Sequence, residues 1–113
     1  MRILFLDDVR QAPPGWVLAR TVEDFCKKAA DHKWDVMSLD HDLGDTNCTG
    51  YGRAPTFDGA WVADWLVRNM DMMPSLVLIH SSNPVGAGRM HKILQPHVNV
   101  RRVQYSQIRK GKV

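Results

Sequence analysis

Three polar clusters each directly follow an apolar run of the chain. These side chains offer carboxylate, imidazole, hydroxyl and amide groups, which are the groups that hold metal ions and phosphates. One such cluster is common in a solvent-exposed turn, but three clusters after three apolar runs indicate a shared site. The clusters are Asp7 and Asp8 after RILFL, Asp40, His41 and Asp42 after WDVMSL, and His80, Ser81, Ser82 and Asn83 after SLVLI.

The carboxylates predict a cation site. Carboxylates brought close together repel one another unless a cation lies between them. Oxygen ligands in an open site suit Mg²⁺ or Mn²⁺, and neighbouring histidines shift the preference toward Mn²⁺. We therefore expect Asp7, Asp8 and Asp40 to hold a divalent metal ion, which would bind phosphoryl oxygens.

The remaining polar residues predict acid–base and phosphate-binding roles. An imidazole titrates near neutral pH, so His41 or His80 is a candidate general acid or base, with Asp40 beside it and Asp42 orienting one ring. Phosphate is expected to bind at the start of a helix, where backbone N–H groups are free. The residues expected to contact it are Ser81, Ser82, Asn83 and the backbone of Gly86. Structural roles stay open: Asp7, Asp8 and Asp42 could cap turns, His41 could be a surface residue, His80 could be a satisfied core histidine, and the serines and Asn83 could form a turn.

The hydrophobic pattern predicts elements that would bring these clusters together. Pro13 and Pro14 exclude a helix between the first two strands, and the glycine-rich residues 41–57 are expected to form a long, functional or disordered loop. Strands are predicted over 2–8, 16–20, 34–39, 75–80 and 98–105, and helices over 22–31, 59–70 and 88–95. This alternation favours an α/β parallel sheet with helices on both faces. In such sheets ligands bind at the carboxyl ends of the strands, where all three clusters lie.

Composition places the chain among ordinary cytoplasmic proteins. The 113 residues predict a single domain, with 44% apolar residues and a net charge of +3. Cys26 and Cys48 are expected to be free thiols in a reducing compartment. No apolar run reaches the roughly 20 residues of a membrane span. The basic end of the chain, from Arg101, predicts either a tail that is flexible from about residue 107 or a contact to phosphate or nucleic acid.

The order of motifs resembles a response-regulator receiver domain. RILFLDD is similar to the first receiver strand with its acidic pair, WDVMSLD to the third strand with the phosphoacceptor at Asp40, and LVLIHSSN to the fourth. The resemblance implies a flavodoxin-like, five-stranded sheet in the order 2-1-3-4-5. VRQAPPG stands where receivers have their first helix, so that helix is expected to be reduced or lost. No Lys-Pro pair follows the last strand, where Arg109 or Lys110 could substitute.

A more specific resemblance is to the cyclic-phosphate processing receiver group. It is carried by LDD-x-R, the Pro-Pro-Gly turn, SLDHDLG and IHS-x-NP-x-G. It implies a phosphoesterase that acts on cyclic phosphates, such as the 2′,3′-cyclic phosphate of nucleotides or RNA ends. Together with the cation site expected from the carboxylates, this predicts a metal-dependent enzyme. Two alternatives remain: a non-catalytic, degenerate receiver that binds protein or RNA, and a phosphoacceptor receiver that uses Asp40. The expected partners are accordingly a phosphorylated small molecule or an RNA end, and no membrane.

Overall fold

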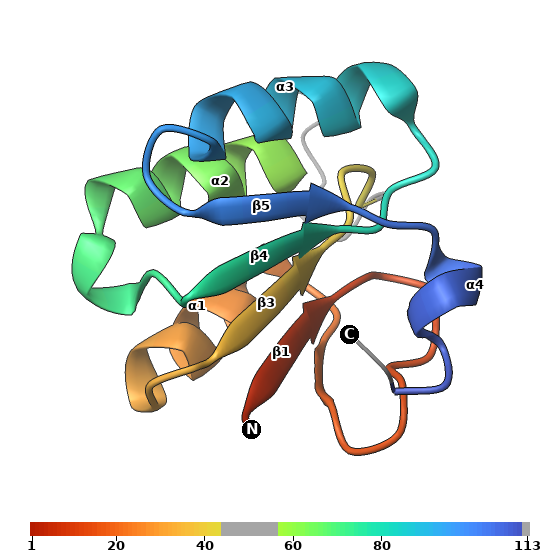
Figure 1. Ribbon diagram of the computed structural model, residues 1–113. Helices are drawn as coiled ribbons and strands as arrows, with labels where there is room; N and C mark the ends of the chain where they lie inside the picture. The colour runs from red at the N-terminus through yellow and green to blue at the C-terminus, as the bar shows by residue number, and fades with distance from the viewer. Residues whose placement is uncertain (44–56, 112–113) are drawn as a thin grey trace, which may run out of the picture.

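Five short strands form a parallel sheet in the order β2-β1-β3-β4-β5 (Figure 1). The predicted flavodoxin-like order and the parallel direction are therefore confirmed. Most of the strands are continuous buried runs, which is the pattern of a sheet covered on both faces. The strands are β1 (Ile3–Leu6), β2 (Val17–Ala19), β3 (Val36–Leu39), β4 (Leu76–Ile79) and β5 (Asn99–Arg102).

The structure is a computed structural model that describes residues 1–43 and 57–111. The predicted loop 41–57 falls largely outside the described residues, as do Cys48 and the last two residues. No helix of the described residues is long and apolar enough to cross a membrane.

The helices follow the predicted pattern with two differences. They are α1 (Val22–Asp31), α2 (Gly59–Arg68), the 3₁₀ turn η1 (Met70–Met72), α3 (Pro84–Leu94) and α4 (Tyr105–Ile108). Helix α3 begins at Pro84 instead of residue 88, because Asn83 caps it and proline is favoured at the first helical position. Helix α4 was not predicted, and a capping box between Gln104 and Gln107 stabilises its single turn.

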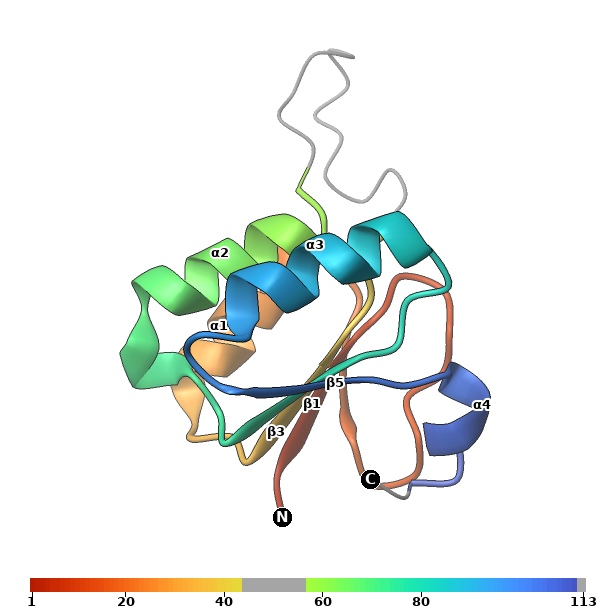
Figure 2. The ribbon, with the colours of Figure 1, turned by 45° about the horizontal axis from the view of Figure 1, so that its top comes forward.

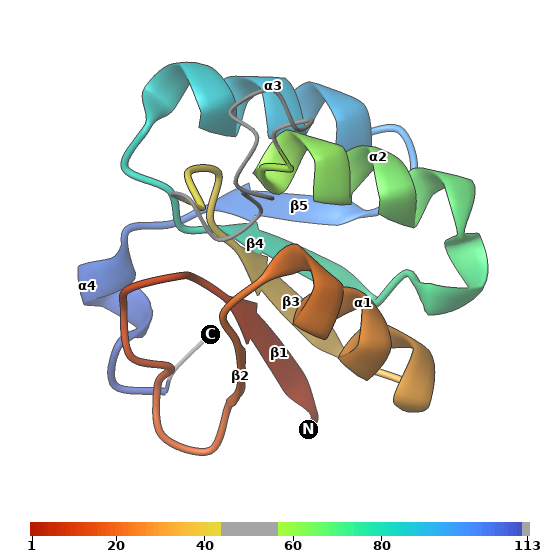
Figure 3. The same ribbon diagram turned by 180° about the vertical axis from the view of Figure 1, so that it is seen from behind.

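The three long helices all pack on one face of the sheet (Figures 2 and 3). Phe25 of α1, Leu66 of α2 and Met90 of α3 share one core with Leu6 and Leu39. Helices do lie on both faces, as predicted, but among the described residues the opposite face carries only the single-turn α4. The Pro13–Pro14 turn leaves no helix between β1 and β2 to cover that face.

The opposite face of the sheet is covered by irregular chain and by α4. Trp16, which precedes β2, and Ile108 of α4 bury Phe5 and Leu78 there. Ile108 is only 2% exposed. The packed part of the chain therefore extends to Ile108, beyond the point at which the tail was expected to become flexible.

Candidate functional site

The sheet register brings three ionisable residues to one point. Leu6 pairs with Leu39, and Leu39 pairs with Ile79, so these three residues form one row across the sheet. The hydrogen-bonded ladder continues one residue further, since Asp40 donates its N–H to Leu6 and His80 donates its N–H to Leu39. The residues that follow this row on β1, β3 and β4 are Asp7, Asp40 and His80.

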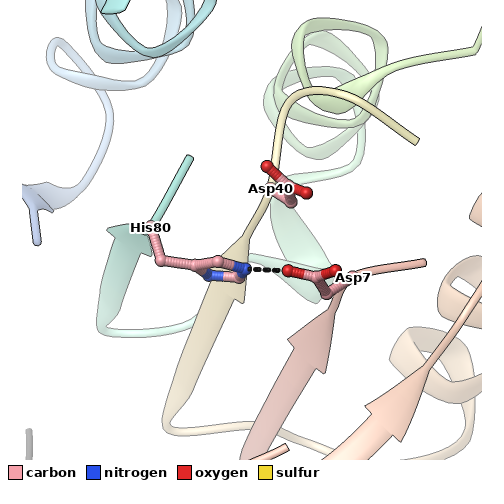
Figure 4. A group of neighbouring side chains, drawn as sticks. All are labelled: Asp7, Asp40 and His80. Carbon is pink, nitrogen blue, oxygen red and sulfur yellow. Dashed lines mark hydrogen bonds and ion pairs between the residues drawn. The ribbon is translucent and has the colours of Figure 1, made fainter. Parts of the chain in front are cut away.

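The three side chains face one another inside the protein (Figure 4). Asp7 is 0%, His80 1% and Asp40 8% exposed. One ligand atom of each residue lies within 4.8 Å of the others. Buried ionisable groups are costly unless they are paired or bind an ion, so this arrangement needs a chemical explanation.

Asp7 is held as a carboxylate by hydrogen bonds. Its Oδ2 lies 3.0 Å from Nε2 of His80. Its Oδ1 accepts the N–H groups of Val9 and Arg10, each at 2.9 Å. Burial alone would raise the pKa of Asp7, but the bond from His80 and the two backbone bonds outweigh it and lower this pKa.

His80 is fixed on its other side by Ser38. The Ser38 hydroxyl lies 2.7 Å from Nδ1 of His80, and the Phe5 ring stacks on the imidazole at a centroid distance of 4.4 Å. The His80 side chain is 0% exposed. In this arrangement both ring nitrogens of His80 are engaged and neither faces solvent.

Asp40 has the opposite electrostatic character to Asp7. Burial raises its pKa, and the negative charge of Asp7 raises it further. The charge of His80 and hydrogen bonds from the His41 N–H and Ser81 lower this pKa but do not compensate. Asp40 is thus the carboxylate that a cation would stabilise most.

The cluster could hold a metal ion, with two carboxylates and one imidazole as ligands. If Nδ1 of His80 donates its proton to the Ser38 hydroxyl, the Nε2 lone pair is free to bind a cation. A hydrogen bond of this kind on the second nitrogen is typical of metal-binding histidines. Asp8, predicted as a ligand, is not part of the described cluster; its place among the described residues is taken by His80.

His41 lies at a second point, between the starts of α2 and α3. Its Nδ1 lies 2.7 Å from Oδ1 of Asp42, as expected of a carboxylate that orients the ring. Its Nε2 lies 3.4 Å from Oδ2 of Asp58, and 14% of the side chain is exposed. A Cβ atom on Gly86 would overlap the His41 ring. Glycine at this position therefore makes room for the imidazole.

The predicted phosphate-binding residues are partly engaged with one another. The Asn83 side chain accepts the Gly86 N–H at 3.0 Å and donates to Asp42 at 3.2 Å. The hydrogen bond from His41 and, after it, the one from Asn83 lower the pKa of Asp42. The Gly86 N–H is thus occupied by the Asn83 cap of α3 instead of being free for phosphate. Ser81 accepts the Asn83 N–H at 3.0 Å, and Ser82 is exposed.

Ser38, Asp58 and Arg10 were missed as site residues by the sequence analysis. Ser38 is a buried hydroxyl inside an apolar strand, two residues before Asp40 and hence on its face. Asp58 does cap α2, accepting the Trp61 N–H at 2.9 Å, but it also faces His41. Arg10 was visible in the LDD-x-R motif, and it donates to the His80 carbonyl at 3.0 Å.

A cleft of about 800 Å³ opens beside the buried cluster. His80, Ser81 and Ser82 line one side of it, and residues of β5 and α4 line the other. Because His80 belongs to both, the cleft lies directly beside the cluster.

Comparison with protein families gave one match. The model of the cyclic-phosphate processing receiver domain matches residues 2–96, which include all three strand-end clusters. Neither the curated proteins nor the solved structures contain a match to the chain.

Proposed function

The chain belongs to the cyclic-phosphate processing receiver domain family, and on this basis we propose that it is a metal-dependent phosphoesterase that hydrolyses cyclic phosphates. The proposed substrates are 2′,3′-cyclic phosphates of nucleotides or RNA ends. The observation that carries the proposal is the cluster of Asp7, Asp40 and His80 at three adjacent strand ends. Two buried carboxylates with pKa shifts of opposite sign are typical of a functional centre.

Asp7, Asp40 and His80 would hold the metal ion, with Mn²⁺ preferred over Mg²⁺. Mg²⁺ favours ligand sets made of oxygen atoms alone, whereas Mn²⁺ accepts an imidazole nitrogen as well. When bound, the ion supplies positive charge for the phosphoryl oxygens. Ser38 keeps the His80 ring oriented through Nδ1, and Ser81 and the His41 N–H hold the Asp40 carboxylate in place.

His41 is the residue that we propose to exchange a proton with the reacting group. It is preferred to His80 because its side chain keeps 14% exposure whereas that of His80 has none. Asp42 binds Nδ1 of His41 and leaves Nε2 as the exchanging nitrogen. Oδ2 of Asp58 lies 3.4 Å from this nitrogen.

Hydrolysis of adenosine 2′,3′-cyclic phosphate tests the proposal. We expect the wild-type protein with Mn²⁺ to open the ring to a monophosphate, as followed by chromatography. Asp7→Asn should lower the rate by roughly 100-fold or more, since even residues that only orient metal ligands matter 10- to 100-fold. His91→Gln, which changes a histidine outside the cluster, should keep the rate. Absence of hydrolysis with both Mn²⁺ and Mg²⁺ would contradict the proposal.

A non-catalytic binding module is the second candidate function. It is favoured by the histidine environments, because each ring nitrogen of His41 and His80 has an oxygen partner among the described residues. A module of this kind would bind the cyclic phosphate without opening it. Tight binding of an unchanged cyclic nucleotide in the presence of metal would favour this function over hydrolysis.

A further inference from the structure

The charges of this chain are separated along its sequence and in its fold. All 12 Asp and Glu residues lie within residues 1–71, and no acidic residue follows. The acid-free part forms β4, α3, β5 and α4. In Figure 1, α3 lies along β4 and β5 on one face of the sheet, and α4 follows the carboxyl end of β5. The charged residues of these elements are all basic.

The cleft beside the cluster of Asp7, Asp40 and His80 lies largely in this basic part. Its lining contains two guanidinium groups, several hydroxyl and amide groups, and no carboxylate. A cleft with this lining is suited to an anion rather than to a cation or an apolar ligand. The polar lining residues are Arg10, Ser81, Ser82, Arg102, Gln104, Tyr105, Ser106 and Gln107.

Arg10 is held in place with donors to spare. Its Nη1 donates to the carbonyl of His80 at 3.0 Å, and its guanidinium lies 5.0 Å from the centroid of the Tyr105 ring. The Arg20 side chain in turn donates to the Arg10 carbonyl at 2.8 Å. A guanidinium carries five N–H donors. Arg10 makes no ion pair with any described carboxylate, so its charge is available to a ligand.

Arg102 faces the same cleft from the end of β5. It pairs in register with Ile79, directly before His80. Its Nη2 donates to the Pro84 carbonyl at 3.0 Å, which leaves further donors. It too lacks an ion pair among the described residues. Arg109 and Lys110, which the sequence offered as the basic residues after the last strand, do not line the cleft.

We propose that this cleft binds a second phosphate group of the substrate, clamped between Arg10 and Arg102. His80 and Ser81 line the cleft, while His80 is also part of the cluster and Ser81 hydrogen-bonds Asp40. A phosphate in the cleft would therefore lie next to the cyclic phosphate that is hydrolysed at the cluster. In a nucleotide with a 2′,3′-cyclic phosphate, the neighbouring phosphate is the one on the 5′ oxygen. A cyclic-phosphate substrate that also carries a 5′ phosphate group should therefore bind more tightly than one with a free 5′ hydroxyl. The assignment to a nucleotide rests on the proposed function, whereas phosphate binding in the cleft does not.

Binding of adenosine 5′-monophosphate to the full chain in excess EDTA tests the inference without metal or turnover. Isothermal titration calorimetry should show binding of the monophosphate, competition by inorganic phosphate, and binding of adenosine at least tenfold weaker. Equal affinity for adenosine and its monophosphate would overturn the inference. Loss of hydrolysis with retained phosphate binding would count against the proposed function alone.

Two adjacent arginines supply a matched pair of variants. Arg102→Gln should weaken binding of the monophosphate about tenfold or more, because it removes a charge-assisted contact. Arg101→Gln makes the same charge change one residue earlier, outside the cleft, and should weaken binding less than twofold. Equal losses for both variants would show that only the overall charge matters and would overturn the site.

A third variant changes the charge of the cleft without disturbing the fold. Gln107 lines the cleft, and its Oε1 accepts the Gln104 N–H at 2.9 Å. Gln107→Glu keeps this acceptor and is favourable in a capping box, so the protein should fold as well as wild type. The added negative charge should nevertheless weaken binding of the monophosphate about tenfold. Unchanged affinity in a folded Gln107→Glu protein would contradict the site.

Discussion

Nε2 of His80 lies 3.0 Å from Oδ2 of Asp7, and both side chains are 0% exposed. The two residues are 73 positions apart in the sequence. They come together because each directly follows the row of Leu6, Leu39 and Ile79 across the sheet. This contact makes His80 a partner of the carboxylate cluster rather than a solvent-facing acid or base.

Ser38→Ala removes the partner of Nδ1 on His80. A buried polar atom left without its hydrogen bond costs about 1–3 kcal/mol, so we expect the free energy of unfolding to fall by that amount. Affinity for Mn²⁺ should also fall roughly 10- to 100-fold, because the ring is no longer oriented. Urea unfolding and calorimetric Mn²⁺ titration measure the two effects. Ser82→Ala, at an exposed hydroxyl, is the control and should leave both unchanged.

Asp40→Asn should stabilise the metal-free protein at neutral pH. The folded-state pKa of Asp40 is raised, so its carboxylate opposes folding once the pH exceeds that pKa. Removing a poorly compensated buried charge should raise the free energy of unfolding by roughly 1 kcal/mol. The gain should disappear below about pH 4, where this carboxyl is protonated in both states. Thermal melts in EDTA across this pH range measure it.

Asp42→Asn supplies the contrasting control for Asp40. The pKa of Asp42 is lowered by its bonds to His41 and Asn83, so its carboxylate favours folding above its unfolded pKa. The stabilisation is lost as the pH falls through the lowered pKa. The Asp42 variant should therefore be less stable than wild type at neutral pH. If Asp40→Asn is instead less stable than wild type in EDTA, the Asp40 carboxylate does not oppose folding as its raised pKa implies.

Asp7, like Asp42, makes the free energy of unfolding fall as the pH is lowered. Its pKa is lowered in the folded state, so its stabilisation is present above the unfolded pKa near 3.9 and is lost during acidification. Asp7→Asn should consequently narrow the stability difference between pH 7 and pH 3 relative to wild type. Urea unfolding at the two pH values measures the change. An unaltered difference would contradict the hydrogen bonding assigned to Asp7.

Gly86→Ala should destabilise the protein by about 2 kcal/mol, because the added methyl group overlaps the His41 ring. Gly88→Ala in the same helix is the matched control. Its methyl group would meet only Arg102, at an ordinary 3.5 Å, and alanine favours helix formation. Gly88→Ala should therefore be neutral or stabilising in a thermal melt.

A double-mutant cycle links the Gly86 effect to His41. In a His41→Ala background the room beside residue 86 is free, so Gly86→Ala should lose most of its cost. An unchanged cost in that background would show that the clash involves another part of the fold.

The sequence allowed the cluster to be located but not its internal pairing. Each buried strand ended in an ionisable residue, and parallel strands place their carboxyl ends together, so the convergence of Asp7, Asp40 and His80 was predictable. The choice of His80 over Asp8 was not, because it depends on which face of the sheet each side chain occupies. Ser38 shares the face of Asp40 through its two-residue spacing, but a single hydroxyl inside an apolar strand did not mark it as a site residue.

The hydrophobic pattern of the sequence also could not predict which face of the sheet each helix covers. Amphipathic spacing predicted α1 and α2 but carries no information about which face of the sheet they cover. Helix α4 was too short to produce a periodic signal, although Ile108 is buried. His41 was predicted to pair with Asp42, while its approach to Asp58 depends on how α2 packs beside α3.

Pulsed electron paramagnetic resonance of bound Mn²⁺ can show whether Asp7, Asp40 and His80 hold a metal ion. We expect one Mn²⁺ site per chain with a magnetic coupling to an imidazole nitrogen. That coupling should vanish in His80→Gln and persist in His91→Gln. If Mn²⁺ fails to bind at millimolar concentration, or if the nitrogen coupling survives in His80→Gln, then Asp7, Asp40 and His80 do not form a metal centre.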